Sequence, residues 1–433
     1  MKILLVEPNY YSQYPPLGLL KLSTWHKQNG DEVRFVKGLS LVTKFVPDEI
    51  KVTSLFTWAW GPVWEAIGFY RALFPKAKIS LGGIYASLTP DHAKQSGADE
   101  VHSGLIREVE DLLPDYDLLP DWQRDRGASI VFSHRGCVRS CGFCAVPKLE
   151  GKPFQVRPTT RVQHLIYPGH KRVILWDNNI LGEPHWRETL EELKSLDVEI
   201  DFNQGLDARL TTEEIAQYLS DLRIPTIRFA YDFVSMRDQI LRAISLFKKV
   251  GLKNRRFRHI SCYVLYNYKD TPDDLYERVR DLLAWGVAAY PMRYQPLSGD
   301  FAFEKDSYIS PAWSRAQLEM VSAARRVIGF GGALPPYEGL VRKFADAKGF
   351  DDAFRLRPHP NKGAPVTPKR AKSHADKFEL KEFGWDLIEM GRDHQFSTAA
   401  IGQPPATSAA AEVIPIASLR SKKKTRADQS THR

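Results

Sequence analysis

Three of the four cysteines in this 433-residue chain lie within eight positions of one another, in the segment SHRGCVRSCGFCAVPK. Cys137, Cys141 and Cys144 have the spacing C-x3-C-x2-C, whereas Cys262 lies far away in a strand-like segment and is expected to be a core residue. A thiolate is a soft anionic ligand, so three of them on one short loop can bind one metal centre. Three cysteines leave one iron of a four-iron cluster without a protein ligand, and a substrate or cofactor could bind there.

A second interpretation of the same loop is a zinc site. The spacing C-x2-C is common in zinc-binding sequences, and His134 could complete a Cys3His set of ligands. A zinc or iron–sulfur module without catalytic activity is therefore the alternative to an enzyme.

The composition is that of an ordinary globular chain, with 43% hydrophobic and 11% aromatic residues. No apolar run approaches the ~20 residues that cross a bilayer, so no membrane partner is expected. The apolar stretch Ile3–Val6 is too short for the hydrophobic region of a signal peptide. Clustered cysteines would lose their capacity to bind metal if they were oxidised, which favours a reducing compartment and predicts a cytoplasmic protein.

The net charge of +9 is concentrated in part at the end of the chain. Residues 420–433 include SKKKTR and a single acid, Asp428. Such a segment could bind nucleic acid by releasing counterions, or it could be a solubilising disordered end.

The first 111 residues alternate strand-like and helix-like segments, which predicts a small doubly wound, Rossmann-like sheet. Strands are expected at 2–6, 32–36, 51–56 and 78–81, and helices at 17–28 and 63–74. Gly82-Gly83 would allow the close approach of a ligand or another backbone, or would form a tight strand exit. The segment 112–127, rich in Pro and Asp, is predicted to be a linker.

Residues 128–297 repeat the alternation, which predicts a partial (βα)6 TIM-like barrel. Strands are expected at 129–133, 172–176, 199–203, 225–230, 259–266 and 287–294, and helices at 186–196, 213–222, 236–250 and 273–285, with a weaker one at 160–167. Residues 298–396, including a helix at 311–328, are predicted to form a C-terminal cap, and residues 397–433 a disordered basic tail.

Polar residues follow several of these strands, where the chemistry of such barrels takes place. Asp177-Asn178-Asn179 could accept hydrogen bonds from an ammonium group or could form an Asx-turn. Arg209 could hold a carboxylate or could pair with Asp207. Asp232 could bind ribose hydroxyls.

The pattern C-x3-C-x-aromatic-C, with Phe143 before the last cysteine, resembles the signature of the radical S-adenosylmethionine superfamily. The resemblance implies a 4Fe–4S cluster on the three cysteines, S-adenosylmethionine on the open iron, a 5′-deoxyadenosyl radical, and an electron donor such as a flavodoxin or ferredoxin. It implies cofactor contacts from Phe143, Asp177, Asn178, Asn179, Arg209, Asp232 and Gln295, the last in a segment, MRYQPL, that resembles the lining of the adenine pocket. It assigns neither a catalytic residue nor a substrate, which could be a macromolecule or a small molecule.

The N-terminal segments PPLGLLKLS and ISLGGIYASLTP resemble the cobalamin-binding-type domain that precedes the radical core in many members of that superfamily. The cobalt-coordinating motif D-x-H-x-x-G is absent, because the loop EPNYYSQYPP after the first strand contains no histidine. Cobalamin is therefore not expected, and the domain is predicted to be a scaffold or a substrate lid.

Overall fold

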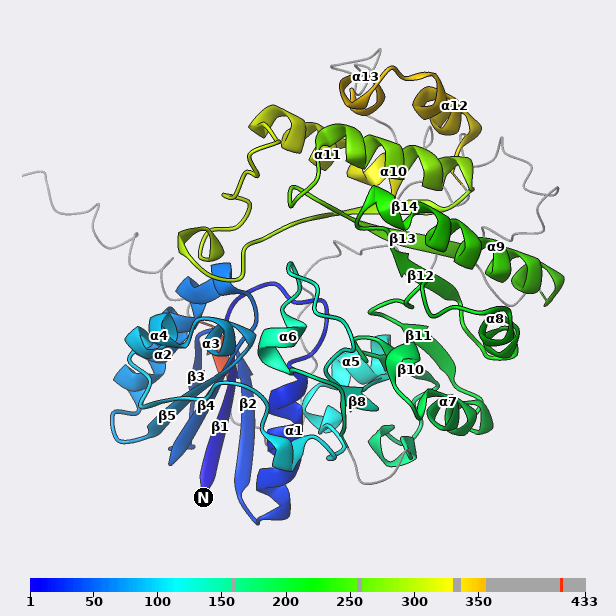
Figure 1. Ribbon diagram of the computed structural model, residues 1–433. Coiled ribbons are helices and arrows are strands. Elements are labelled where there is room, and N and C mark those ends of the chain that lie inside the picture. Colours follow the sequence, from blue (N-terminus) through cyan, green and yellow to red (C-terminus); the bar gives the residue numbers. More distant parts are fainter. Residues whose placement is uncertain (157–160, 255–258, 330–335, 356–412, 416–433) are drawn as a thin grey trace, which may run out of the picture. The chain divides into compact units, whose positions relative to one another are not determined.

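The computed structural model describes residues 1–156, 161–254, 259–329, 336–355 and 413–415 (Figure 1). Residues Met1–Phe354 and Ala411–Arg433 belong to one compact unit, and the second unit, Arg355–Ala410, lies outside the described residues except for Arg355. In the part of the chain that the structure describes, no helix has both the length and the apolar character needed to span a bilayer.

The N-terminal part is built on a five-stranded parallel sheet with the order β2-β1-β4-β5-β6. These strands are β1 Lys2–Glu7, β2 Glu32–Lys37, β4 Glu49–Ser54, β5 Lys78–Gly83 and β6 Glu100–Val101. The short strand β3 Ser40–Val42 pairs with β15 Val413–Pro415 in antiparallel fashion. Residues 413–415 are thus an exception within the tail that the sequence predicts to be disordered.

Helices cover both faces of this sheet, because the side chains of a strand alternate between its two faces. Ile3 and Leu5 of β1 pack with Leu19 of helix α1 (Leu17–Gln28). The alternate residues of β1 belong to the cluster that contains Val63 and Ile67 of helix α2 (Trp60–Leu73). The doubly wound arrangement expected from the sequence is therefore present, followed by helices α3 Ile84–Leu88 and α4 Pro90–Ala93.

Gly83 shows why two glycines end strand β5. Its φ is +102°, and a Cβ atom on it would lie 2.1 Å from the carbonyl oxygen of Ser54. The glycine is needed for close packing of β5 against β4, so the approaching group is another backbone.

The predicted linker is a packed segment with its own short helices, the 3-10 helix Tyr116–Leu118 and α5 Pro120–Asp125. Tyr116 is fully buried, and its hydroxyl accepts the N–H of Ile130 at 2.7 Å. The Pro- and Asp-rich composition of this segment does not by itself reveal a buried tyrosine.

Two three-stranded parallel sheets follow, β11-β10-β7 and β12-β13-β14. Their strands are β7 Ala128–Val131, β10 Arg172–Leu175, β11 Glu199–Phe202, β12 Thr226–Ala230, β13 His259–Tyr266 and β14 Ala288–Arg293. Backbone hydrogen bonds of 2.8 Å from Ile200 to Arg223 and from Leu206 to Arg228 connect the two sheets. Neighbouring strands within each sheet are consecutive strands of this repeat, so the α/β class is as predicted.

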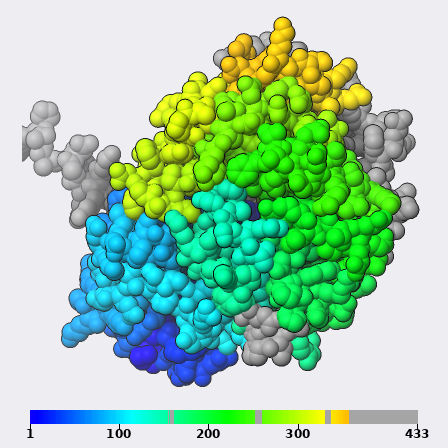
Figure 2. Space-filling model, viewed as in Figure 1, coloured from blue at the N-terminus to red at the C-terminus, as the bar shows by residue number. Residues whose placement is uncertain are grey.

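The intervening helices are α7 Trp186–Ser195, α8 Glu213–Ser220, α9 Arg237–Asn254 and α10 Pro272–Ala284. Figure 1 shows α7, α8 and α9 along one side of β10, β11 and β12, and the green surface of Figure 2 includes α9 and α10. The largest hydrophobic cluster joins the strands to these helices. Thr212 caps α8, and Thr271 forms a capping box with Asp274 at the start of α10.

The region between β7 and β10 differs from the predicted repeat. It holds the short antiparallel strands β8 His134–Arg135 and β9 Phe154–Gln155, and helix α6 Val146–Leu149. The expected weak helix at 160–167 is reduced to the 3-10 helix Gln163–Leu165 in its described part.

The C-terminal extension begins with helix α11 Arg315–Ile328, four residues later than predicted because Ser314 caps it through a capping box with Gln317. Helices α12 Glu338–Asp346 and α13 Phe350–Phe354 follow. The rest of the predicted cap and tail, apart from 413–415, lies outside the described residues.

Candidate functional site

The three clustered cysteines lie on the loop between β8 and α6, which follows the carboxyl end of β7. All three are half-buried free thiols, and the N–H of Cys144 donates to the carbonyl of Cys141 at 3.0 Å. Cys262 is fully buried in the large cluster, as predicted for a core residue.

A single carboxylate closes the base of this loop. Glu150 accepts the N–H of Gly136 and the side-chain amide of Asn178, both at 2.8 Å. Its other oxygen accepts Nη1 of Arg135 at 3.0 Å. Hydrogen bonds that involve a charged group are stronger than those between neutral groups. Glu150, at the end of the cysteine loop, therefore holds Arg135 and Gly136 at its start and Asn178 of the loop after β10.

Arg135 also belongs to a buried ionic network with Glu110 and Lys21. Nε of Arg135 donates to Glu110 at 2.8 Å, and Lys21 of α1 lies 3.6 Å from the same Glu110 oxygen. Burial lowers the pKa of Lys21 to about 8, although Glu110 opposes this shift. Helix α1 is thereby joined to the base of the cysteine loop.

Burial raises the pKa of both Cys141 and Cys144. Arg209 acts in the opposite direction on Cys141, and the backbone N–H of Val146 does so on Cys144. The other two cysteines of the trio raise the pKa of Cys144 further. Ligation of a metal requires each thiol to lose its proton.

Among the described residues, no group of three His, Cys, Asp or Glu side chains is placed to hold a single metal ion. Ligands of one zinc ion would have to bring their sulfur atoms within about 4 Å of one another, given Zn–S bonds of about 2.3 Å. His134, the expected fourth zinc ligand, is 1% exposed, and its Nδ1 lies 2.8 Å from Asp177. In an iron–sulfur cluster, by contrast, each cysteine would bind a different iron.

Asp177 anchors the start of the loop. Its Oδ1 accepts the backbone N–H groups of Ser133 and His134, both at 2.9 Å, and the Ser133 hydroxyl at 2.6 Å. Oδ2 is buried without a hydrogen-bond partner. One oxygen of Asp177 therefore has a structural role, while the other has no hydrogen-bond partner within the described structure.

The two asparagines after Asp177 have different roles. Asn178 donates to Glu150 and belongs to the closure of the loop. Asn179 is 6% exposed and donates to Asp207 at 3.1 Å, and its Oδ1 is buried without a partner. An unpaired buried acceptor carries a desolvation cost, which a bound ammonium or hydroxyl group would remove.

The loop after β11 contacts the cysteine loop through Asp207. Arg139, between Cys137 and Cys141, donates to Asp207 at 3.0 Å. Arg209 donates to both oxygens of the same carboxylate, at 2.7 and 3.1 Å. The alternative interpretation of Arg209 as the partner of Asp207 is thus what the structure contains, and this pairing lowers the pKa of Asp207 despite its burial.

Asp232 and Phe143 come from opposite sides of the same region. Burial raises the pKa of Asp232 to about 6, and the charge of Asp232 raises the pKa of Cys141. The ring of Phe143 lies 6.2 Å from Phe233 and 5.7 Å from Tyr268, measured between centroids. The loops after β12 and β13 therefore adjoin the cysteine loop.

Gln295 makes contacts of a different kind. Its side chain donates to the carbonyl of Phe301 at 2.5 Å and accepts the N–H of Asp306 at 3.3 Å. These bonds hold the loop 299–306, and no contact of Gln295 with the cysteine loop is present in the described structure.

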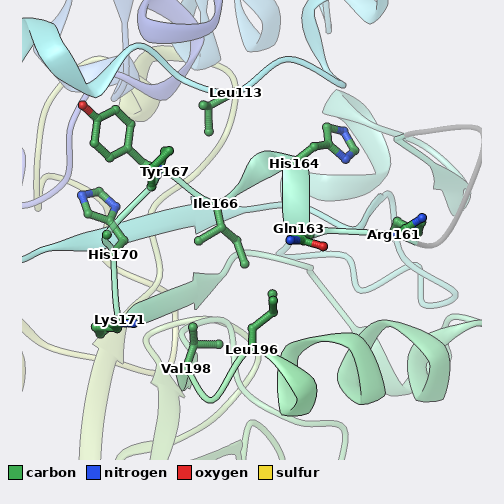
Figure 3. Close-up of a pocket in the computed structure, with 12 residues that line it drawn as sticks. Leu113, Arg161, Gln163, His164, Ile166, Tyr167, His170, Lys171, Leu196 and Val198 are labelled. Atoms are coloured by element: carbon green, nitrogen blue, oxygen red, sulfur yellow. The ribbon is translucent and has the colours of Figure 1, made fainter.

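A hollow of about 800 Å³ lies at the other end of the strands (Figure 3). Lys171 and Val198, which line it, immediately precede β10 and β11, whereas the cysteine loop follows β7. The hollow is therefore separate from the candidate site.

Comparison with models of protein families gives no match, and neither does a search of curated proteins. A solved structure described as "Crystal structure of a galactofuranose binding protein" aligns with 76% of this chain and 100% of that one, at 10% identity. Its TM-score of 0.16 is too low to support an argument about fold or function.

Proposed function

We propose that this chain is a radical S-adenosylmethionine enzyme, in which Cys137, Cys141 and Cys144 hold a 4Fe–4S cluster. The observation that carries the proposal is the convergence of loops from successive parallel strands on the cysteine loop. Asp177 reaches its start, Asp207 binds its Arg139, and Phe233 and Tyr268 contact its Phe143. Functional sites of parallel α/β folds lie at such strand ends.

The proposal includes a partial barrel formed by β7, β10, β11, β12, β13 and β14. Its support is the sequential parallel order of the strands and the two hydrogen bonds that connect β11 with β12 and its flanking residues. A six-stranded arc leaves one side open, and α11 begins soon after its last strand.

When bound, the cluster and S-adenosylmethionine would supply reductive cleavage of the sulfonium and a carbon radical that abstracts hydrogen from the substrate, with an electron from a flavodoxin or ferredoxin. The residues of this chain would position and shield those groups. The three cysteines would give up their protons, and Glu150 and Asp177 would hold the loop. Asn179 offers a free buried oxygen to an ammonium group, and Phe143 with its aromatic neighbours would exclude water.

The free thiols fit a reducing cytoplasm. A nucleic-acid partner for the basic tail stays a prediction, because residues 416–433 lie outside the described part of the chain. Cobalamin forms no part of the proposal.

Anaerobic reconstitution with iron and sulfide, followed by a reductant and S-adenosylmethionine, tests the proposal. We expect a brown protein that produces 5′-deoxyadenosine, a Cys141→Ala variant that loses cluster and product together, and a Cys262→Ala control that retains both. A colourless protein with one tightly held zinc ion would establish the alternative, a metal-binding module without catalysis.

A further inference from the structure

Strands β11, β12 and β13 carry polar side chains on the face opposite the large hydrophobic cluster. Ile200, Phe202, Ile227 and Phe229 belong to that cluster, and Asp201 and Arg228 alternate with them. Parallel strands covered on both faces are usually apolar on both. Buried polar groups need hydrogen-bonding partners, so a polar ligand group would suit this face.

Arg228 is the central group of this face and is 8% exposed. Its Nη1 donates to Oδ1 of Asp201 and, at 3.4 Å, to the carbonyl of Phe202. Its Nε and Nη2 have no partner among the described residues, and neither is sealed from solvent. A guanidinium has five N–H donors in a fixed fork, which suits a carboxylate or phosphate.

The neighbouring carboxylates do not use up this capacity. Oδ2 of Asp201 accepts Arg172 at 2.6 Å, and Glu199 lies 3.5 Å from the same Arg172. Arg172 thus pairs with both Glu199 and Asp201. Among the described residues, the one carboxylate that Arg228 contacts is that of Asp201.

Two tyrosines bind Asn203 at the end of β11, and one of them keeps a free hydroxyl proton. The Tyr14 hydroxyl accepts the side-chain N–H of Asn203 at 2.6 Å, so its own proton remains to be donated. Asn203 directly follows Phe202, whose carbonyl accepts Nη1 of Arg228, and the Tyr263 hydroxyl donates to the carbonyl of Asn203 at 3.5 Å.

We propose that this polar face binds a carboxylate or phosphate group of the substrate, with Arg228 as its main contact and Tyr14 as an additional donor. The inference rests on the proposed function for the identity of the reaction. Asp232, beside the cysteine loop, lies four positions after Arg228, which corresponds to about 13 Å of extended chain. The anionic group would therefore lie on a part of the substrate remote from the reacting carbon.

The test uses the full chain without iron, sulfide or S-adenosylmethionine, so that it does not depend on the cluster. Binding of inorganic phosphate and of acetate is measured by calorimetry at constant ionic strength, with chloride as the reference anion. We expect Arg228→Gln to weaken the binding of the more tightly bound anion about tenfold or more. Arg228→Lys keeps the positive charge but loses the forked guanidinium. Its affinity for the anion should lie between that of the unaltered protein and that of Arg228→Gln.

The matched control is Arg223→Gln, because Arg223 is an exposed arginine paired with Asp197 just before β12. Its binding should equal that of the unaltered protein. Equal weakening by Arg223→Gln and Arg228→Gln, or no anion bound above the level of chloride, would overturn the inference. If Arg228→Gln does not fold, Arg228→Lys decides. A protein that binds phosphate through Arg228 but makes no 5′-deoxyadenosine would refute the proposed function alone.

Discussion

The carboxylate of Glu150 accepts the backbone N–H of Gly136 at 2.8 Å, although fourteen positions separate the two residues. This bond encloses all three clustered cysteines, because Cys137 directly follows Gly136 and Cys144 precedes Glu150. The closure is strengthened by Arg135 and Asn178, which donate to the same carboxylate.

Replacement of Glu150 should therefore loosen the cysteine loop. We expect Glu150→Ala to lower the free energy of unfolding by about 3 kcal/mol, since three donors lose a charged acceptor, and Glu150→Gln by about half as much. The cluster reconstituted in Glu150→Ala should lose iron faster during dialysis. Urea denaturation and iron analysis measure these effects, with the exposed Glu319→Gln as a control. An unchanged rate of iron loss would show that the loop does not need this closure.

Gly136 offers a second test of the same closure. Its φ is +81°, and a Cβ atom would lie 2.4 Å from the carbonyl oxygen of Lys152, whereas Gly151 has a similar φ of +74° and open space. Alanine should cost about 1–2 kcal/mol at either position from backbone strain alone. Gly136→Ala should cost clearly more, because the β8–β9 hairpin must also move. Comparable midpoints of thermal unfolding for the two variants would contradict this reasoning.

The strands and helices of this chain were readable because their signals are local. Buried strands such as Lys2–Glu7 are short apolar runs, and Thr271 with Asp274 forms the capping box that its sequence predicts. Within the predicted linker, the buried Tyr116 accepts the N–H of Ile130, fourteen positions away, and no local pattern in the sequence indicates this contact. The start of α11 at Arg315 does carry a local signal, because Ser314 and Gln317 form its capping box.

The candidate site was predictable only in part. The spacing of the cysteines is local, and strand ends can be inferred from the alternation of elements. Glu150 and Arg139 were missed, since their partners Gly136, Asn178 and Asp207 come from other loops. A spacing pattern indicates which residues share a loop, whereas the closure of that loop is a tertiary property.

Asp177 should matter more to the fold than its neighbour Asn178. In Asp177→Ala, the buried N–H groups of Ser133 and His134 lose their acceptor, at about 1–3 kcal/mol each. We expect the free energy of unfolding to fall by about 3 kcal/mol or more. Asp177→Asn keeps one acceptor oxygen, so its free energy of unfolding should fall less. Asn178→Ala should lower the free energy of unfolding by about 1 kcal/mol, because it removes a single donor. Denaturant titration of the protein without iron separates these cases, and a larger loss in Asn178→Ala would reverse the assignment.

Asp232 should make the stability of the iron-free protein depend on pH in the acidic range. Burial raises its pKa from the ordinary value of 3.8 to about 6. The folded state therefore holds this proton more tightly than the unfolded state, so stability is fully present below about pH 4 and decreases as pH rises through 6. In Asp232→Asn this loss is absent, and relative to the unaltered protein the variant should gain up to about 3 kcal/mol between pH 4 and 7. Urea unfolding at a series of pH values measures the difference, and the exposed Asp238→Asn on α9 serves as the control. A difference that stays constant from pH 4 to 7 would mean that Asp232 has the same proton affinity in both states, and hence that burial does not govern its charge.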